Sequence, residues 1–186
     1  MPRLRVALAQ VNPRVGDLDG NAGLVLASCR DAAAAGAHIV AMPEMVLNGY
    51  PIEDLAYRAS FIEASRAHVN DLALQLQAEG LGELVVVVGH LDTAKDHLKD
   101  RLGLPKNVPT NSASVLTGGR VVARYDKHHL PNYGVFDEFR HFVPGDETQV
   151  IQVGGVDVAI AMSTPPTWMT WHSSPGTKCR NSSKTP

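Results

Sequence analysis

The chain has 186 residues, of which 44% are hydrophobic, 19% are charged and 5% are aromatic, and its formal net charge is −2. This composition predicts a globular domain with its own core and argues against global disorder. Basic residues form no stripe and aromatic residues are scarce, so we expect no nucleic-acid-binding surface.

The N-terminal segment shows no export signal. Residues 1–5 lead into a short alternating apolar segment, whereas a signal peptide has a longer apolar run and a small-residue cleavage site. No run approaches the roughly 18 apolar residues that cross a bilayer. Two cysteines are too few for a disulfide framework, and Cys29, in an Ala-rich helical stretch, is expected as a small buried hydrophobic residue. We therefore expect a cytoplasmic protein without a membrane partner.

The first elements predict a parallel pair of strands. Residues 5–11 are apolar and are expected as a buried strand, followed by a turn. A helix is expected from Asn21, as its N-cap, to Gly36, which occupies the usual position after a helix end. The apolar residues 37–42 form the next strand. This strand–helix–strand order indicates parallel pairing through a right-handed crossover.

The middle of the chain predicts a longer helix and a central strand. Residues 51–57 are a loop or short helix. Residues 61–79 form a helix with one apolar stripe, and Gly80 ends it; the stripe consists of Ile62, Val69, Leu72 and Leu76. Residues 84–88 are apolar and β-branched, as in a central strand. Residues 92–110 are polar and are expected as an exposed loop.

Two Gly-Gly turns predict hairpins in the later part of the chain. The first joins residues 112–117 to 120–125, and the second joins 149–153 to 156–161. Helices that alternate with strands early and hairpins that follow late indicate the α/β class with a mixed sheet.

The pattern ends after Met162. Residues 163–186 show no strand or helix period, and Pro165 and Pro166 prevent continued strand pairing. We expect residues 1–162 to form the domain and residues 163–186 to form a disordered tail.

Two residues with reactive side chains follow predicted strands. Glu44 follows residues 37–42, at the edge where parallel sheets bind ligands, and burial there would make it a usable general base. Lys127 follows residues 121–125, where a fixed ammonium could stabilise an oxyanion. Taken singly, each is more simply explained as a solvated loop residue.

A metal site is not expected. The adjacent histidines His128 and His129 would point to opposite sides of an extended backbone. No spacing of Cys, His or Asp around them repeats a ligand pattern.

Residues 132–146 combine three phenylalanines, a tyrosine and several charges with turn residues. Two interpretations remain open. The segment is either a loop that packs on its own aromatic rings or one wall of a pocket for a polar substrate.

Taken together, these segments resemble the carbon–nitrogen hydrolase (nitrilase-like) family, and within it the glutaminase domains at the N-terminus of glutamine-dependent NAD synthetases. The resemblance covers residues 3–162. It is carried by the runs Val6 to Gln10, Val15 to Asn21, Met42 to Leu55 and Tyr125 to Asp146. Its most specific parts are Gly49-Tyr50-Pro51-x-Glu53-Asp54-Leu55 and Lys127-x-x-Leu130-Pro131-Asn132-Tyr133-x-x-Phe136-x-Glu138.

The resemblance implies a four-layer α-β-β-α sandwich, of which this chain would form an incomplete part, and a Glu–Lys–Cys triad. It identifies Glu44 as the general base and Lys127 as the cation that stabilises the oxyanion.

The same resemblance implies a set of substrate-binding residues. Glu138 resembles the second, supporting glutamate of the family. Tyr133 and Phe136 resemble residues that line a glutamine pocket, and Tyr50 is expected near the same pocket.

The family's reaction implies glutamine as substrate. A cysteine thiolate attacks the side-chain amide, ammonia leaves, and water hydrolyses the thioester. The resemblance implies no cofactor for this domain, since ATP and deamido-NAD belong to a separate synthetase domain that we do not find in this sequence. It leaves a homo-oligomer open.

The sequence departs from the family pattern at the nucleophile. The family continues its strand with Ile-Cys-Glu-Asp, whereas this chain has Met162-Ser163-Thr164-Pro165. A serine hydroxyl is far less acidic than a thiol, so Ser163 is a poor replacement. Cys179 has no predicted strand to hold it. The abrupt loss of pattern suggests the hypothesis of a reading-frame break that truncates the domain.

Three function classes therefore remain. The chain is a glutaminase-domain piece that is inactive alone, an enzyme with a displaced nucleophile, or a non-catalytic part that binds or oligomerises. A different carbon–nitrogen hydrolase, an amidase, is a further alternative.

Overall fold

A computed structural model describes residues 3–105, 107–134 and 136–162. Their elements run in the order β1 (Val6–Leu8), α1 (Leu18–Ala34), β2 (Ile39–Ala41), the 3-10 helix η1 (Glu53–Tyr57), α2 (Ala59–Ala78), β3 (Val85–Thr93), α3 (Asp96–Leu102), β4 (Pro109–Thr117), β5 (Arg120–Asp126), α4 (Glu138–His141), β6 (Gln149–Val153) and β7 (Val156–Ile160). The predicted tail, 163–186, lies outside the described residues.

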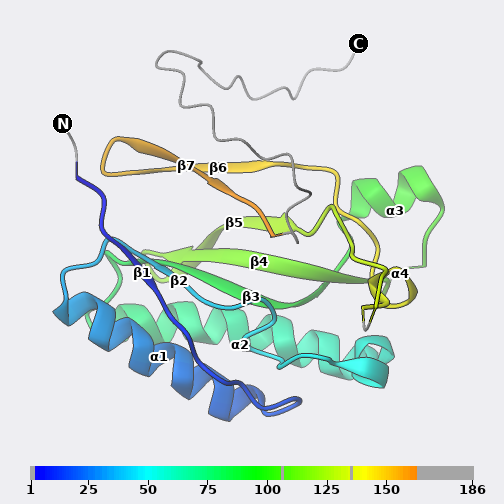
Figure 1. The fold of residues 1–186 in the computed structure, drawn as a ribbon, viewed down its shortest axis with the longest axis horizontal. Helices are drawn as coiled ribbons and strands as arrows, with labels where there is room; N and C mark the ends of the chain where they lie inside the picture. The colour runs from blue at the N-terminus through cyan, green and yellow to red at the C-terminus, as the bar shows by residue number, and fades with distance from the viewer. Residues whose placement is uncertain (1–2, 106, 135, 163–186) are drawn as a thin grey trace.

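These elements stack in layers (Figure 1). Helices α1 and α2 cover one face of a five-stranded sheet, and the β6–β7 hairpin covers part of the other face. The core between helices and sheet includes Val25, Leu72 and Val86. A smaller cluster that includes Val115 and Ile160 joins the sheet to the hairpin. The described residues thus supply an α-β-β stack, in agreement with the expected mixed α/β fold.

The five-stranded sheet is mixed, as predicted. Its strand order is β1-β2-β3-β4-β5. Strands β1, β2 and β3 are parallel, and β3, β4 and β5 are antiparallel. The carboxyl ends of the parallel strands therefore meet at one edge, where β2 leads into Met42-Pro43-Glu44. Both predicted hairpins are present, as β4–β5 and β6–β7.

The helices agree with their sequence patterns. The predicted stripe of α2 is buried, with Ile62, Val69, Leu72 and Leu76 at most 3% exposed. Cys29 is fully buried in α1. Helix α1 begins earlier than predicted, because Asp17 is its N-cap and accepts a hydrogen bond from the Gly20 amide (3.0 Å). Asn21 instead lies inside the helix, and its side chain donates to the backbone oxygen of Leu47.

Two predictions about exposure are wrong. The first strand was expected to be buried, but β1 is a short edge strand in which Leu8 is 74% exposed. Residues 92–110 were expected to form an exposed loop, but β3 extends to Thr93, α3 follows, and β4 begins at Pro109. The polar residues there misled the prediction because several are buried and paired; Asp92, for example, accepts from Arg124 Nη1 at 2.7 Å.

Within the described residues, no helix combines the length and the apolar character that crossing a bilayer requires.

Gly89 allows β3 to approach the loop that carries Glu44. A Cβ atom at Gly89 would lie 2.4 Å from the Met45 backbone nitrogen and 2.7 Å from the Pro43 carbonyl oxygen. The Gly89 carbonyl in turn accepts a hydrogen bond from the Leu47 amide (3.1 Å). Only a residue without a side chain fits this close backbone contact.

We predict that Gly89→Ala lowers the free energy of unfolding by about 1–3 kcal/mol, the usual range for an overpacked site. Urea unfolding of the purified chain measures this change. Gly23→Ala in α1 is the matched control, because a Cβ added there would meet no neighbouring atom within 4 Å; it should stabilise the helix by up to about 1 kcal/mol. Equal effects of the two substitutions would contradict the close-approach argument.

Candidate active site

The candidate site is organised around a buried ammonium group. The side chain of Lys127, directly after β5, is only 2% exposed. Its Nζ atom donates to Glu44 Oε1 at 2.7 Å and to Glu138 Oε1 at 3.0 Å. The side chain of Glu138 is also 2% exposed, whereas that of Glu44 is 39% exposed. The structure thus brings together three residues that the sequence identified separately.

Glu44 is fixed by the turn that follows β2. Met45 has a positive φ of 53°, which reverses the chain. The Val46 amide then donates to the Pro43 carbonyl (3.2 Å). Met45, Val46 and Leu47 are fully buried, so this turn is part of the core. The carboxylate therefore projects from a rigid support.

Lys127 and Glu138 belong to one loop with a closed base. The Gly145 amide donates to the Lys127 carbonyl (3.0 Å), so the chain leaves the sheet after Lys127 and returns beside it. A Cβ at Gly145 would lie 2.3 Å from the Asp126 carbonyl oxygen, which explains glycine at this crossing. Within the loop, the Glu138 amide donates to the Pro131 carbonyl (3.1 Å). These contacts turn Glu138 back toward Lys127.

Burial and charge shift two pKa values in the site. Burial raises the pKa of Glu138, and its contacts with the Lys127 ammonium only partly oppose this. Burial, followed by the nearby Glu138 and Glu44 carboxylates, raises the pKa of Tyr50 to about 12. The Tyr50 hydroxyl therefore stays protonated and donates to Glu138 Oε1, at 3.4 Å.

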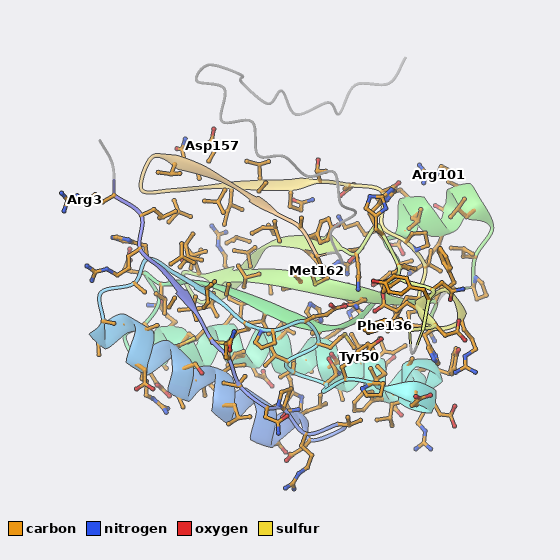
Figure 2. The ribbon with its side chains drawn as sticks, viewed as in Figure 1. Arg3, Tyr50, Arg101, Phe136, Asp157 and Met162 are labelled. Carbon is orange, nitrogen blue, oxygen red and sulfur yellow. The ribbon has the colours of Figure 1, made fainter. Side chains whose placement is uncertain are left out.

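A cavity of about 310 Å³ lies against this cluster. Its lining combines the charged groups with apolar walls: Pro43, Glu44, Tyr50, Lys127, Pro131, Phe136 and Glu138. A second cavity, of about 250 Å³, shares Pro43 and Glu44 and is bounded by the end of β7 and residues up to Met162. Figure 2 shows Tyr50 and Phe136 at the same end of the sheet, with Met162 on the hairpin side.

Tyr133 is placed differently from the other expected pocket residues. It is 57% exposed and is not part of the lining of the cavity beside Lys127. Its ring meets Phe136 edge to face, with 5.8 Å between ring centroids. Tyr133 therefore supports the position of Phe136, and its assignment as a substrate-binding residue stays a prediction.

Asn111 is a site residue that the sequence patterns did not identify; its Nδ2 atom donates to Glu44 Oε1. The residue falls between the loop predicted at 92–110 and the strand predicted from 112. The signal that could have identified it is the asparagine itself. Asparagine is depleted within strands, so an asparagine in a strand indicates a specific polar contact.

The sequence prediction of no metal at His128 and His129 stays a prediction, but one of their ring nitrogens has a protein partner. His128 Nδ1 faces the Gly145 carbonyl oxygen, so this nitrogen is the ring donor in that contact. Among the described residues, one group with suitable spacing lies elsewhere, on the surface, and consists of His97, Asp146 and Glu147. The carboxylates of that group are already paired with Arg101 and Lys95.

The family model for carbon–nitrogen hydrolases matches residues 5–176. The chain belongs to the carbon–nitrogen hydrolase family. The structure places Lys127 between Glu44 and Glu138, and the catalytic roles that the resemblance implies for them stay predictions.

Relatives of this family member include glutamine-dependent NAD(+) synthetases. The enzyme of Thermotoga maritima is 36% identical over 162 residues, which cover 87% of this chain and 26% of the relative. The enzyme of Rhodobacter capsulatus is 37% identical over 173 residues, which cover 91% of this chain and 27% of the relative. The chain therefore spans about a quarter of the length of these relatives.

Solved structures agree with the fold. The glutamine-dependent NAD+ synthetase of Acinetobacter baumannii superimposes with a TM-score of 0.69 at 30% identity, over 85% of this chain and 27% of that one. An amidase from Nesterenkonia sp. superimposes with a TM-score of 0.65 at 23% identity, over 86% of this chain and 55% of the amidase chain. The amidase supports the fold alone.

We predict that Lys127→Met destabilises the chain by about 3–5 kcal/mol at neutral pH, because it leaves Glu138 buried without its cation. The loss should shrink toward about pH 5, where the carboxyl can take up a proton instead. Urea unfolding at both pH values measures this. Lys95→Met removes a more exposed pair with Glu147 and should cost less than about 1 kcal/mol. A loss for Lys127→Met that is independent of pH would argue against a charge effect.

The raised pKa of Glu138 predicts a pH dependence of stability. A carboxyl whose pKa is higher in the folded state contributes stability at low pH that is lost as pH rises through the folded pKa. The melting temperature of Glu138→Gln, relative to that of the unchanged chain, should therefore increase from about pH 4 to pH 7. Glu79 provides the opposite control, because Arg30 lowers its pKa; Glu79→Gln should lose relative stability over the same range. Parallel trends in the two variants would refute the prediction.

Proposed function

We propose that residues 5–162 form the base-and-cation part of a glutamine amidohydrolase site. The observation that carries this proposal is the Lys127 ammonium, held between Glu44 and Glu138 on the wall of a small cavity. The names of the relatives, glutamine-dependent NAD(+) synthetases, support glutamine as the amide.

The roles follow from charge and position. Glu44 is the proton acceptor, since it is the more exposed carboxylate and lines both cavities. Lys127 has three N–H donors. The one not engaged by the two glutamates can serve the oxyanion that forms when an amide carbonyl is attacked. Glu138 fixes the ammonium from the buried side.

The cavity suits a small carboxamide. Its volume of about 310 Å³ is at the lower end of the range for ligand pockets. Pro43, Pro131 and Phe136 offer apolar walls for a short methylene chain. The two carboxylates disfavour an anionic end group in the same place, so the site should prefer glutamine to glutamate.

The proposed site still needs a nucleophile to attack the amide. Residues 160–162 line a cavity together with Glu44, so the chain reaches the site at its last described residues. The next position is Ser163, which lies outside the described residues. A glutamate is too weak a base to activate a serine hydroxyl well. We therefore propose that the chain as written binds the amide without appreciable turnover.

The remaining expectations stay predictions. We expect ammonia released by a complete domain to be used with ATP and deamido-NAD in a separate synthetase domain. A location in the cytoplasm and self-association of the chain are likewise predicted from sequence alone.

The test combines binding and turnover with the purified chain. We expect calorimetry to detect L-glutamine binding that exceeds L-glutamate binding at neutral pH, and a coupled ammonia assay to detect no release above background. Ser163→Cys alone should restore little activity, because a proline two residues later restricts the backbone that would have to present the thiol.

Two results would refute this proposal. Absence of glutamine binding by a folded chain would remove the amide site. Steady glutamine turnover that is abolished by Cys179→Ala would instead show a displaced nucleophile.

A further inference from the structure

Asn111 contacts both groups that the proposed function assigns to chemistry. It lies in β4 and is fully buried. Its Nδ2 atom donates to Glu44 Oε1, the same oxygen that accepts from Lys127 Nζ at 2.7 Å. Its backbone carbonyl accepts from the Lys127 amide at 2.8 Å. A single strand residue thus links the base to the backbone that carries the cation.

We propose that Asn111 is a positioning residue that fixes Oε1 of Glu44 and leaves Oε2 as the proton-accepting oxygen. Within the described residues, the hydrogen bonds to the Glu44 carboxylate go to Oε1. Two donors on one oxygen restrict rotation of the carboxylate, so the second oxygen keeps a constant direction. The proton-accepting role of Oε2 rests on the proposed function, whereas the hydrogen bond between Asn111 and Glu44 does not.

Packing alone does not explain an asparagine here. In the described structure, the Oδ1 atom of Asn111 is buried and has no hydrogen-bond partner. A buried acceptor without a partner lowers stability. Because an apolar residue would avoid that loss, the position is explained by what the Nδ2 group does for Glu44.

A neutral donor also suits the charge of the site. Lys127 already faces two carboxylates, Glu44 and Glu138, and the Tyr50 hydroxyl reaches the same cluster. An additional cation would bind Glu44 more tightly and make it a weaker base. An amide N–H orients the carboxylate without adding a charge.

A donor–acceptor exchange tests the contact without any ligand. Asn111→Asp places a second carboxylate against Glu44, with Lys127, Glu138 and Tyr50 facing the same cluster. Two adjacent carboxyls resist joint ionisation. At each pH from 5 to 8, we expect the melting temperature of this variant to be at least about 5 °C below that of the unchanged chain.

Adding Glu44→Gln to Asn111→Asp reverses the direction of the hydrogen bond, because the glutamine amide can then donate to the new carboxylate. We expect the double variant to recover at least half of the melting-temperature loss at pH 8, measured against Glu44→Gln alone. The control is Asn70→Asp, which removes a donor to Arg66 on an exposed surface. Its effect should be small and unchanged by Glu44→Gln.

Carboxyl labelling measures the positioning directly and covers the case in which Asn111→Asp does not fold. In Asn111→Ala, Glu44 loses one of its two donors. We expect its labelling by carbodiimide and glycine ethyl ester, followed by peptide mass spectrometry, to rise several-fold. Labelling of Glu53, whose side chain is 65% exposed, should stay constant.

The outcomes separate the two proposals. Absence of rescue in the double variant, or unchanged Glu44 labelling in Asn111→Ala, would overturn the positioning role. Rescue and increased labelling in a chain that does not bind glutamine would support the positioning role while refuting the proposed function.

Discussion

The structure depends on one electrostatic constraint, the burial of the Lys127 ammonium. A lysine side chain with 2% exposure is stable only where carboxylates replace the water that it loses. Glu44 and Glu138 fill this role from two different loops. The turn after β2 and the loop that contains α4 must therefore close on the same atom. The same two segments also meet in a small apolar cluster that includes Met45, Leu130 and Phe142, so the buried charge lies beside packed apolar side chains.

The sheet makes this convergence possible. Parallel β1, β2 and β3 direct their carboxyl ends to one edge, and the antiparallel β4–β5 hairpin returns Lys127 to the same edge. Gly89 and Gly145 then let the two loops approach the backbone more closely than any side chain would permit. The position of the site thus follows from strand direction, and its close contacts follow from glycine.

Sequence patterns predicted most strands and both long helices, because their apolar residues follow a regular period. Strand ends marked Glu44 and Lys127, while the family resemblance supplied Glu138, Tyr50 and Phe136, which line the same cavity. Asn111 was missed for a physical reason. In β3, β4 and β5 several inward-facing positions are polar, and buried pairs such as Arg124–Asp126, at 3.0 Å, replace apolar contacts. A polar stretch with buried partners cannot be distinguished from a loop until the partners are known.

The contacts of Lys127 with Glu44 and Glu138 serve the stability of the fold as well as the proposed chemistry. Removing Lys127 would leave carboxylates unpaired at the loop bases, so the fold itself favours keeping Glu44, Lys127 and Glu138 together. A nucleophile has no comparable structural role, since a cysteine and a serine differ by a single atom and pack alike. The electrostatic part of the site can therefore persist in a chain that performs no hydrolysis. In the proposed site, Glu44, Lys127 and Glu138 therefore hold the loops in place whether or not a nucleophile is present.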